Sequence, residues 1–163
     1  FKGSVRDNLQ IAKPTASDQE LWKVLEKTNL STFFKEKAGL DTPIEMAGQN
    51  LSGGQRQRLT LARVLLYDSD IIIFDEATSN IDAESEADIL KVIHELTQTK
   101  TIILISHRLA NVQQADHILV LKNGELVEQG THQQLLNNAH HYCELWNTQQ
   151  QLEQVLRGEA GGE

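Results

Sequence analysis

Residues 71–76 read IIIFDE, a run of four apolar residues, three of them β-branched, that ends in two carboxylates. Short continuous apolar runs of this kind are typical of parallel strands that are buried on both faces. Residues 101–105 (TIILI) form a second such run, which is followed by Ser106 and His107. Helical patterns alternate with these two strands, so the sequence predicts an α/β domain with a mainly parallel sheet.

Helix signals lie on both sides of the first predicted strand. Residues 17–20 (SDQE) have the S-x-x-E form of a capping box, which predicts a helix over residues 18–28. After a loop-like stretch over residues 35–50, residues 51–55 (LSGGQ) open another helix, whose arginines we expect to be polar decoration. Asp82 is expected to cap the next helix, whose acidic first turn suits the helix dipole.

The last third of the chain carries smaller elements. Asn123 and Gly124 lie between two short apolar runs, which predicts a hairpin. A C-terminal helix is expected over residues 142–156, followed by a flexible tail over residues 157–163. The whole chain is expected to have three parts, namely a helical subdomain (residues 1–66), a core with both strands (residues 67–138), and the C-terminal helix with its tail (residues 139–163).

Composition narrows the class of protein. The net charge of −8 argues against a nucleic-acid-binding protein, which would need a basic face. The longest apolar runs are only a few residues long, far below the roughly 20 that a membrane-spanning helix needs. A single cysteine, Cys143, leaves no disulfide framework within the chain, so a reducing cytoplasm is the expected surrounding.

The pair of glycines in residues 51–55 can be interpreted in two ways. Glycines at a helix start let backbone N–H groups approach a ligand closely, and the helix dipole favours an anion there. Ser52 would add its hydroxyl to such a site. The alternative is a simple capping box, in which Ser52 and Gln55 satisfy the helix start and no ligand is involved. The motif alone leaves both interpretations open.

The polar residues at the strand ends also allow two interpretations. Ligands of open α/β sheets bind outside the carboxyl ends of the strands. There Asp75 could hold Mg²⁺ through water, and Glu76 could orient or deprotonate an attacking water. His107, after the second strand, could reach a γ-phosphate. Alternatively the two acids are solvated residues at a strand end, and His107 is a surface histidine or one whose hydrogen bonds are satisfied within the fold. We expect the same of the other five histidines, namely His94, His117, His132, His140 and His141.

The order of these motifs decides between the interpretations. LSGGQ is followed about 15 residues later by the apolar strand that ends in Asp-Glu, then by ATSNID and then by a strand with Ser-His, a set that chance would rarely assemble. From residue 1 to about residue 137, the sequence resembles the nucleotide-binding domain of ABC transporters. By this resemblance the chain contains the signature loop (residues 51–55), the Walker B strand (residues 71–75), the catalytic glutamate (Glu76), the D-loop (residues 79–82) and the switch histidine (His107).

The resemblance implies a P-loop NTPase-like fold of the ABC ATPase type, in which a partial parallel sheet carries a helical signature subdomain. ATP and Mg²⁺ are the implied ligands. The residues implied in catalysis are Glu76 and His107, the metal residue is Asp75, and the nucleotide-binding residues are Leu51, Ser52, Gly53, Gly54, Gln55 and Asp82.

The implied partners follow from the same family. Two nucleotide-binding domains, identical or different, sandwich two ATP molecules head to tail, each between the Walker A phosphate loop of one domain and the signature loop of the other. Opening and closing of this sandwich drives a transmembrane permease domain from the cytoplasmic face of the membrane. Residues 1–9 (FKGSVRDNL) look like the segment after the Q-loop in permease-fused exporters, and residues 108–112 (RLANV) are similar to bacterial cysteine or glutathione exporters.

Two features depart from the family pattern. Exporters carry a T-x-x-G-E-x-G-like stretch that touches the permease, whereas residues 42–48 read TPIEMAG. The 163 residues also contain no Gly-Lys dipeptide and hence no Walker A motif, G-x-x-x-x-G-K-[ST]. We therefore expect the chain to be part of a longer protein and to be inactive by itself.

Two alternatives to a transport ATPase stay open. One is a non-transport ABC-type ATPase of the DNA-repair or chromosome kind, although the sequence shows no heptad run for the coiled coils of that class. The other is a non-catalytic module that only donates its signature loop.

Overall fold

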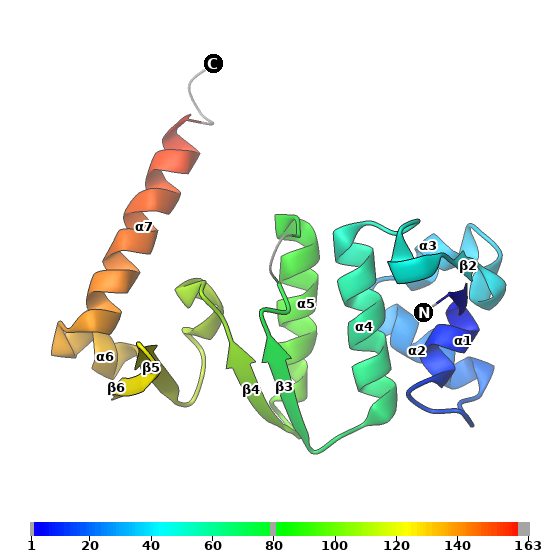
Figure 1. Ribbon diagram of the computed structural model, residues 1–163, viewed down its shortest axis with the longest axis horizontal. Helices are drawn as coiled ribbons and strands as arrows, with labels where there is room; N and C mark the ends of the chain where they lie inside the picture. The colour runs from blue at the N-terminus through cyan, green and yellow to red at the C-terminus, as the bar shows by residue number, and fades with distance from the viewer. Residues whose placement is uncertain (1, 79–80, 160–163) are drawn as a thin grey trace. The chain divides into compact units, whose positions relative to one another are not determined.

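The computed structural model describes residues 2–78 and 81–159, and Figure 1 labels their helices and strands. The chain divides into two compact units, of which the first ends at Ile105 and the second begins at Ser106. The three-part division expected from the sequence, with boundaries after residues 66 and 138, stays a prediction.

The first unit gathers around helix α4 (Gly53–Tyr67). This helix packs against α1 (Val5–Gln10) and α2 (Asp18–Lys27) and, separately, against α5 (Ala83–Leu96), so that it lies between them (Figure 1). The helix predicted over residues 18–28 is confirmed as α2 and ends one residue earlier. The smaller elements of this part are β1 (Gly3–Ser4), α3 (Ser31–Lys35), η1 (Gly39–Asp41), β2 (Pro43–Ile44) and η2 (Met46–Gly48).

Strands β3 (Ile71–Asp75) and β4 (Thr101–Ile105) form a two-stranded parallel sheet. Ile71 is opposite Thr101 and Asp75 is opposite Ile105, so both strands end at the same edge. The predicted mixed α/β fold with a partial parallel sheet is therefore confirmed.

Burial alternates along this sheet. Ile72 and Phe74 pack into an apolar cluster with residues of α4 and α5 such as Leu61 and Ile89. Ile71 and Ile73, on the other face, are 59% and 63% exposed. The prediction of strands buried on both faces is therefore wrong for this chain, because the helices packed against the sheet in the first unit cover one face only.

Strand β4 lies at an edge of the sheet, and this position predicts how the chain assembles. β4 pairs with β3 and with no other strand of the residues that the structure describes, as expected for an unpaired edge. Ile103 and Ile105 of β4 are about half exposed. An exposed apolar edge strand is a template for another chain, so we expect the 163-residue chain to self-associate. In light scattering, Ile103→Lys should shift the chain toward monomer, and a wild-type chain that stays monomeric contradicts this expectation.

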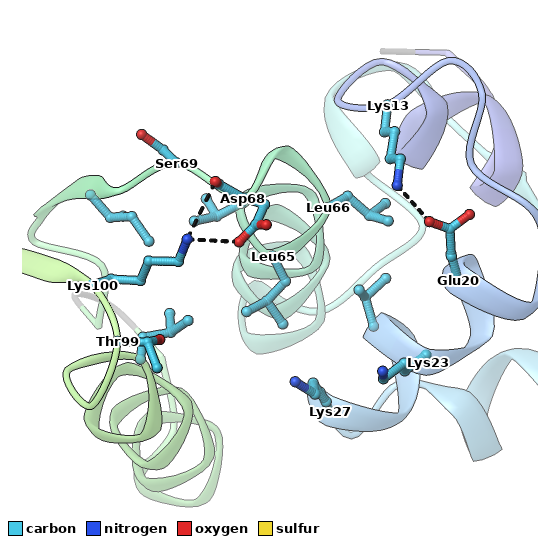
Figure 2. Close-up of a pocket in the computed structure, with 14 residues that line it drawn as sticks. Lys13, Glu20, Lys23, Lys27, Leu65, Leu66, Asp68, Ser69, Thr99 and Lys100 are labelled. Carbon is cyan, nitrogen blue, oxygen red and sulfur yellow. Dashed lines mark hydrogen bonds and ion pairs between the residues drawn. The ribbon is translucent and has the colours of Figure 1, made fainter.

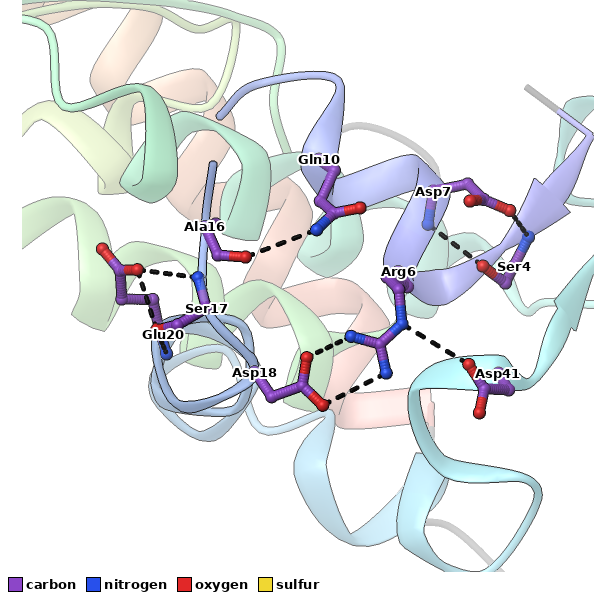
Figure 3. Close-up of polar contacts among 9 residues, drawn as sticks. All are labelled: Ser4, Arg6, Asp7, Gln10, Ala16, Ser17, Asp18, Glu20 and Asp41. Atoms are coloured by element: carbon purple, nitrogen blue, oxygen red, sulfur yellow. Dashed lines mark hydrogen bonds and ion pairs between the residues drawn. The ribbon is translucent and has the colours of Figure 1, made fainter. Parts of the chain in front are cut away.

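Polar contacts fasten the starts of the first helices (Figure 3). Ser4 and Ser17 each form a capping box with the acidic residue three positions later, so both α1 and α2 have satisfied N-termini. The box predicted at the start of α2 is thus confirmed. The guanidinium of Arg6 bonds to both carboxylate oxygens of Asp18, and its Nε donates to Asp41 Oδ1 at 3.5 Å. Arg6 therefore links α1 to the start of α2 and to η1.

The cap of α2 makes its contribution to stability dependent on pH. The Glu20 carboxylate accepts hydrogen bonds from Lys13 Nζ at 2.5 Å and from the Ser17 N–H at 2.8 Å. These contacts lower the pKa of Glu20 from 4.5 to about 2, and the hydrogen bond from Lys13 has the largest effect. Because the folded pKa lies below the unfolded one, the stabilisation is fully present above the unfolded pKa and is lost as the pH falls through the folded pKa.

Thermal unfolding of the chain between pH 7 and pH 2 tests this linkage. Glu20→Gln should lower the Tm at pH 7, and its difference from wild type should shrink as the pH approaches 2. Glu26→Gln is the matched control, since Glu26 is an exposed acid of the same helix without an ion pair to a described residue. A difference between Glu20→Gln and wild type that grows on acidification contradicts the assignment.

The second unit contains a hairpin and two helices. β5 (Ile118–Lys122) and β6 (Glu125–Gly130) pair antiparallel, and the predicted hairpin is confirmed. Asn123 and Gly124 have φ values of 53° and 83°, the left-handed backbone that a two-residue turn requires. The remaining elements are η3 (Leu109–Val112), α6 (His132–Asn138) and α7 (His141–Glu159).

Helix α7 is longer than the sequence suggests. It continues to Glu159, so the expectation that residues 157–159 belong to a flexible tail is wrong. The single Gly158 costs a helix only about 1 kcal/mol relative to alanine, which is too little to end it. Residues 160–163 lie outside the described residues. Among the helices that are described, none combines the length and the apolar character that a membrane span requires.

Candidate functional site

The two predicted carboxylates lie where β3 ends and the chain turns. Glu76 has a φ of 48°, in the left-handed region that residues with a side chain rarely adopt. Its N–H donates to the carbonyl of Ile105 at 3.0 Å, which holds the turn against the end of β4. Asp75 and Glu76 are both exposed. Both residues are therefore accessible to a ligand or a water molecule at the carboxyl ends of the parallel strands.

The positive φ of Glu76 carries a cost in free energy. A non-glycine residue in the left-handed region costs on the order of 1–3 kcal/mol, and such residues gather at functional sites where the surrounding structure holds them. Glycine would adopt this conformation without strain. The same backbone conformation occurs at Ala47 and Ala139, so it is compatible with the predicted role of Glu76 without being specific to it.

The predicted signature loop, residues 51–55, forms the start of α4. The Ser52 hydroxyl accepts the Gln55 N–H at 3.1 Å, and Gln55 Oε1 accepts the Ser52 N–H at 2.9 Å, so the capping box is present. A serine hydroxyl that accepts one bond still has its own proton to donate. The N–H groups of Gly53 and Gly54 have no hydrogen-bond partner among the described residues. The capping box and an anion site are hence compatible here, because the Ser52 hydroxyl proton and the Gly53 N–H stay available at the positive end of a helix dipole, whereas Gly54 is buried.

Side chains outside the motif hold this loop in place. Arg56 Nη1 donates to the carbonyl of Leu51 at 2.5 Å and to that of Gly48 at 3.4 Å. Asn50 Nδ2 donates to the Pro43 carbonyl at 2.8 Å, which ties the loop to β2. Arg56 is exposed, as its place in the helical pattern suggests, but it also holds the loop through these two hydrogen bonds. The sequence carries no signal for this role, since an arginine that folds back on its own loop has the same pattern as one in solvent.

Asp82 forms the N-cap of α5, as predicted. Its Oδ1 accepts the Ser85 N–H at 2.8 Å. That backbone hydrogen bond is the main reason that the pKa of Asp82 is lowered from its usual value. The carboxylate is therefore charged at neutral pH, and its Oδ1 is already used in the cap of α5. The contact of Asp82 with a nucleotide stays a prediction. Residues 79–80 of the expected D-loop lie outside the described residues.

His107 is the second residue after β4 and belongs to the second unit. Its carbonyl accepts Gln149 Nε2 at 2.5 Å, so its backbone is tied to α7 of the same unit. The structure brings Asp75 and Glu76 together at one strand end, whereas the predicted cooperation of His107 with them stays a prediction.

The carboxylates of the site suit a metal ion that takes most of its oxygen ligands from water and from a bound phosphate. No cluster of three or more His, Cys, Asp or Glu side chains able to hold an ion is found within residues 2–78 and 81–159. Asp75 offers a single carboxylate, which suits Mg²⁺, an ion that keeps several waters and takes further oxygens from phosphates.

A cavity of about 380 Å³ lies elsewhere in the first unit (Figure 2). It is lined mainly by residues of α2 and of the end of α4, together with Ile72 near the start of β3 and Lys100 just before β4. Asp75 and Glu76 lie at the opposite end of β3. Lys13 pairs with Glu20, and Lys100 pairs with Asp68 at 2.9 Å. The hydrogen bond to Asp68 raises the pKa of Lys100. The charges of Lys13 and Lys100 are thus balanced by ion pairs with carboxylates. The cavity is separate from the predicted nucleotide site.

Comparison with known proteins agrees with the motifs. Residues 2–79 match the family model described as "ABC transporter". An uncharacterized ABC transporter ATP-binding protein of Haemophilus influenzae is 50% identical over 155 residues, which are 95% of this chain and 28% of that protein. The glutathione/L-cysteine transport system ATP-binding/permease protein of Escherichia coli is 38% identical over 87% of this chain and 25% of its own length.

A solved structure gives the same result. The structure of a bacterial Atm1-family ABC exporter with ATP bound superimposes with a TM-score of 0.84 at 35% identity, over 91% of this chain and 26% of that one. This chain is part of an ABC transporter ATP-binding domain, as its motifs predict. It spans about a quarter of the length of the curated relatives that it matches.

Proposed function

We propose that this chain is part of the ATP-hydrolysing engine of an ABC exporter and acts within a longer protein that carries a permease domain. The observation that carries the proposal is the combination of a helix start with free donors at Ser52–Gly54 and two exposed carboxylates at the end of β3. The exporter names among the relatives support the same class of protein. By this proposal the chain works at the cytoplasmic face of a membrane.

In this proposal the chain serves two different nucleotides. Ser52, Gly53 and Gly54 donate to the phosphates of an ATP that is held by a second nucleotide-binding domain, with Leu51 and Gln55 shaping the loop and Asp82 next to it. Asp75, Glu76 and His107 act on an ATP held by the phosphate loop of their own protein. The donors at the start of α4 suit the first task, because they point out of a helix N-terminus toward an anion.

The chemistry of the second task divides among three side chains. Mg²⁺, when bound, neutralises charge on the ATP phosphates. Asp75 holds the ion through water, as its single exposed carboxylate allows. Glu76 orients the attacking water and accepts its proton. His107 donates to an oxygen of the γ-phosphate and so stabilises the charge that grows there.

The proposal extends to ATP-driven export and not to a particular cargo. The curated relatives include an ATP-dependent lipid A-core flippase of Desulfotalea psychrophila (39% identical, 91% of this chain, 26% of that protein). A flippase and a glutathione/L-cysteine transport system differ in cargo, and the present chain is 38–39% identical to both. The similarity of residues 108–112 to cysteine or glutathione exporters therefore does not select a substrate.

Replacing Asp75 tests the proposed function in the full-length protein. Asp75→Asn should weaken Mg²⁺-dependent ATP binding roughly tenfold or more, since contacts with charged groups are worth about 1.5–3 kcal/mol. The measurement is nucleotide binding and phosphate release as a function of Mg²⁺ concentration. Asp70→Asn is the control, because Asp70 is a highly exposed acid just before β3. A full-length protein without Mg²⁺-dependent ATPase activity, or an Asp75→Asn variant with wild-type behaviour, contradicts the proposal.

A further inference from the structure

Helix α4 and helix α5 touch directly at the starts of both helices. A Cβ atom built on Gly54 would lie 2.1 Å from Ser85 Oγ and 2.6 Å from Ser85 Cβ. Both distances are below any that real Cβ atoms show. Ser85 is buried, with 4% of its surface exposed. The absence of a side chain at position 54 is therefore needed for the packing of these two helices, whatever ligand the loop takes.

A second contact, one helical turn further on, keeps the two helices in register. Arg58 Nη1 donates to Asp88 Oδ2 at 3.0 Å, and the two side chains are only 17% and 26% exposed. Gly54 and Arg58 are four residues apart on α4, while Ser85 and Asp88 are three apart on α5, so each pair lies on one helix face. Arg58 Nε is buried without an acceptor among the described residues, an arrangement that costs stability.

The two contacts connect Ser52 and Asp82, the two helix caps that are proposed to lie near a nucleotide. Ser52 caps α4, and Asp82 caps α5 by binding the N–H of Ser85 itself. The same residue, Ser85, thus holds the Asp82 carboxylate with its backbone and meets the backbone of Gly54 with its side chain. Any shift of the signature loop must therefore move Ser85 and Asp82, because close-packed contacts transmit displacement.

We propose that Ser85 is a positioning residue for the signature loop, and that Gly54 is a glycine chiefly because Ser85 packs against it rather than because nucleotide does. Arg58 and Asp88 keep the two helices in the register that this contact needs. The functional part of the proposal rests on the ATPase role proposed above, whereas the packing part does not.

Position 54 could require glycine because of packing against Ser85 or because of the nucleotide. Compensating substitutions in the full-length protein separate these two reasons. Gly54→Ala should lower the Tm and reduce kcat/KM for ATP roughly tenfold or more, because the new methyl group collides with Ser85. Ser85→Gly removes both colliding atoms and keeps the backbone N–H that Asp82 binds, and Asp82 Oδ2, 3.3 Å from the same Cβ position, must still give slightly. The double variant Gly54→Ala/Ser85→Gly should therefore regain the Tm and the kcat/KM of Ser85→Gly alone, to within about threefold in kcat/KM.

The outcomes are distinct. A double variant with the Tm of Ser85→Gly but the low kcat/KM of Gly54→Ala overturns the proposal, because the glycine would then be needed at the nucleotide. A double variant that is no more stable than Gly54→Ala also overturns it, because the packing contact would not be the cause. If the wild-type protein hydrolyses no ATP, the proposed function fails, while recovery of the Tm still supports the packing contact.

Discussion

Glu76→Gln in the full-length protein is expected to slow ATP hydrolysis about 10²–10⁴-fold while ATP binding survives. Glu76 follows Asp75 directly at the end of β3, in a left-handed backbone conformation that is bonded to Ile105. The proposed function assigns the metal to Asp75, so the proposed task of Glu76 is to orient and deprotonate water. Glutamine keeps the size of the side chain and can still form hydrogen bonds, but it cannot accept a proton as a carboxylate does.

In the proposed mechanism hydrolysis reopens the ATP-bound dimer, so the variant should accumulate ATP in the closed dimer. Phosphate release, nucleotide retention and dimer lifetime under Mg²⁺–ATP would be compared with those of the wild type. Glu84→Gln is the matched control, because Glu84 is an exposed acid in the first turn of α5. A Glu76→Gln variant that hydrolyses ATP at the wild-type rate excludes Glu76 as the catalytic carboxylate. A variant that cannot bind ATP would instead place Glu76 in the metal site.

The 163-residue chain alone is expected to hydrolyse no ATP and to bind it only weakly. A phosphate loop and its lysine supply most of the positioning in phosphoryl transfer, and these residues contain no such motif. The chain retains the donors of Ser52–Gly54 and the carboxylates at the end of β3, which we expect to hold the triphosphate only weakly without a phosphate loop. The measurement is phosphate release by the purified chain and by the full-length protein under the same Mg²⁺–ATP conditions.

The control for this comparison is Glu76→Gln in the isolated chain. Turnover by the chain that depends on Mg²⁺ and disappears in this variant contradicts the expectation, because it would show that the chain is catalytically sufficient. Turnover that persists in the variant would come from a contaminating ATPase. An inactive chain beside an active full-length protein agrees with a role as one part of a composite site.

The parts of the fold that could be predicted from the sequence are those fixed by local interactions. The starts of α2, α4 and α5 were predictable because a side chain at each N-cap binds the backbone within the next turn. The hairpin was predictable because Asn123 and Gly124 tolerate a positive φ. The carboxylates at the end of β3 were predictable because an apolar run that stops at Asp75 places them at a strand end.

The features that the sequence could not indicate depend on distant neighbours. Helices α1 and α3 have six and five residues, too few to show an apolar period. The runs at β3 and β4 look the same whether one sheet face or both are covered, so the exposure of Ile71 and Ile73 had no signal. The contact between Gly54 and Ser85 joins two helices whose separation along the chain gives no indication of their packing.

The central claim is that this chain serves one ATP with its signature loop and another with Glu76. Two full-length copies joined in tandem can test it with Glu76→Gln and Ser52→Asp, the latter keeping an N-cap residue while its charge opposes phosphate. Placed on different copies, the two changes fall in the same composite site and leave the other intact, so ATP hydrolysis should continue. Placed on one copy, they damage both sites, and hydrolysis should fall to background. The reverse pattern, or equal rates for the two arrangements, would contradict the account.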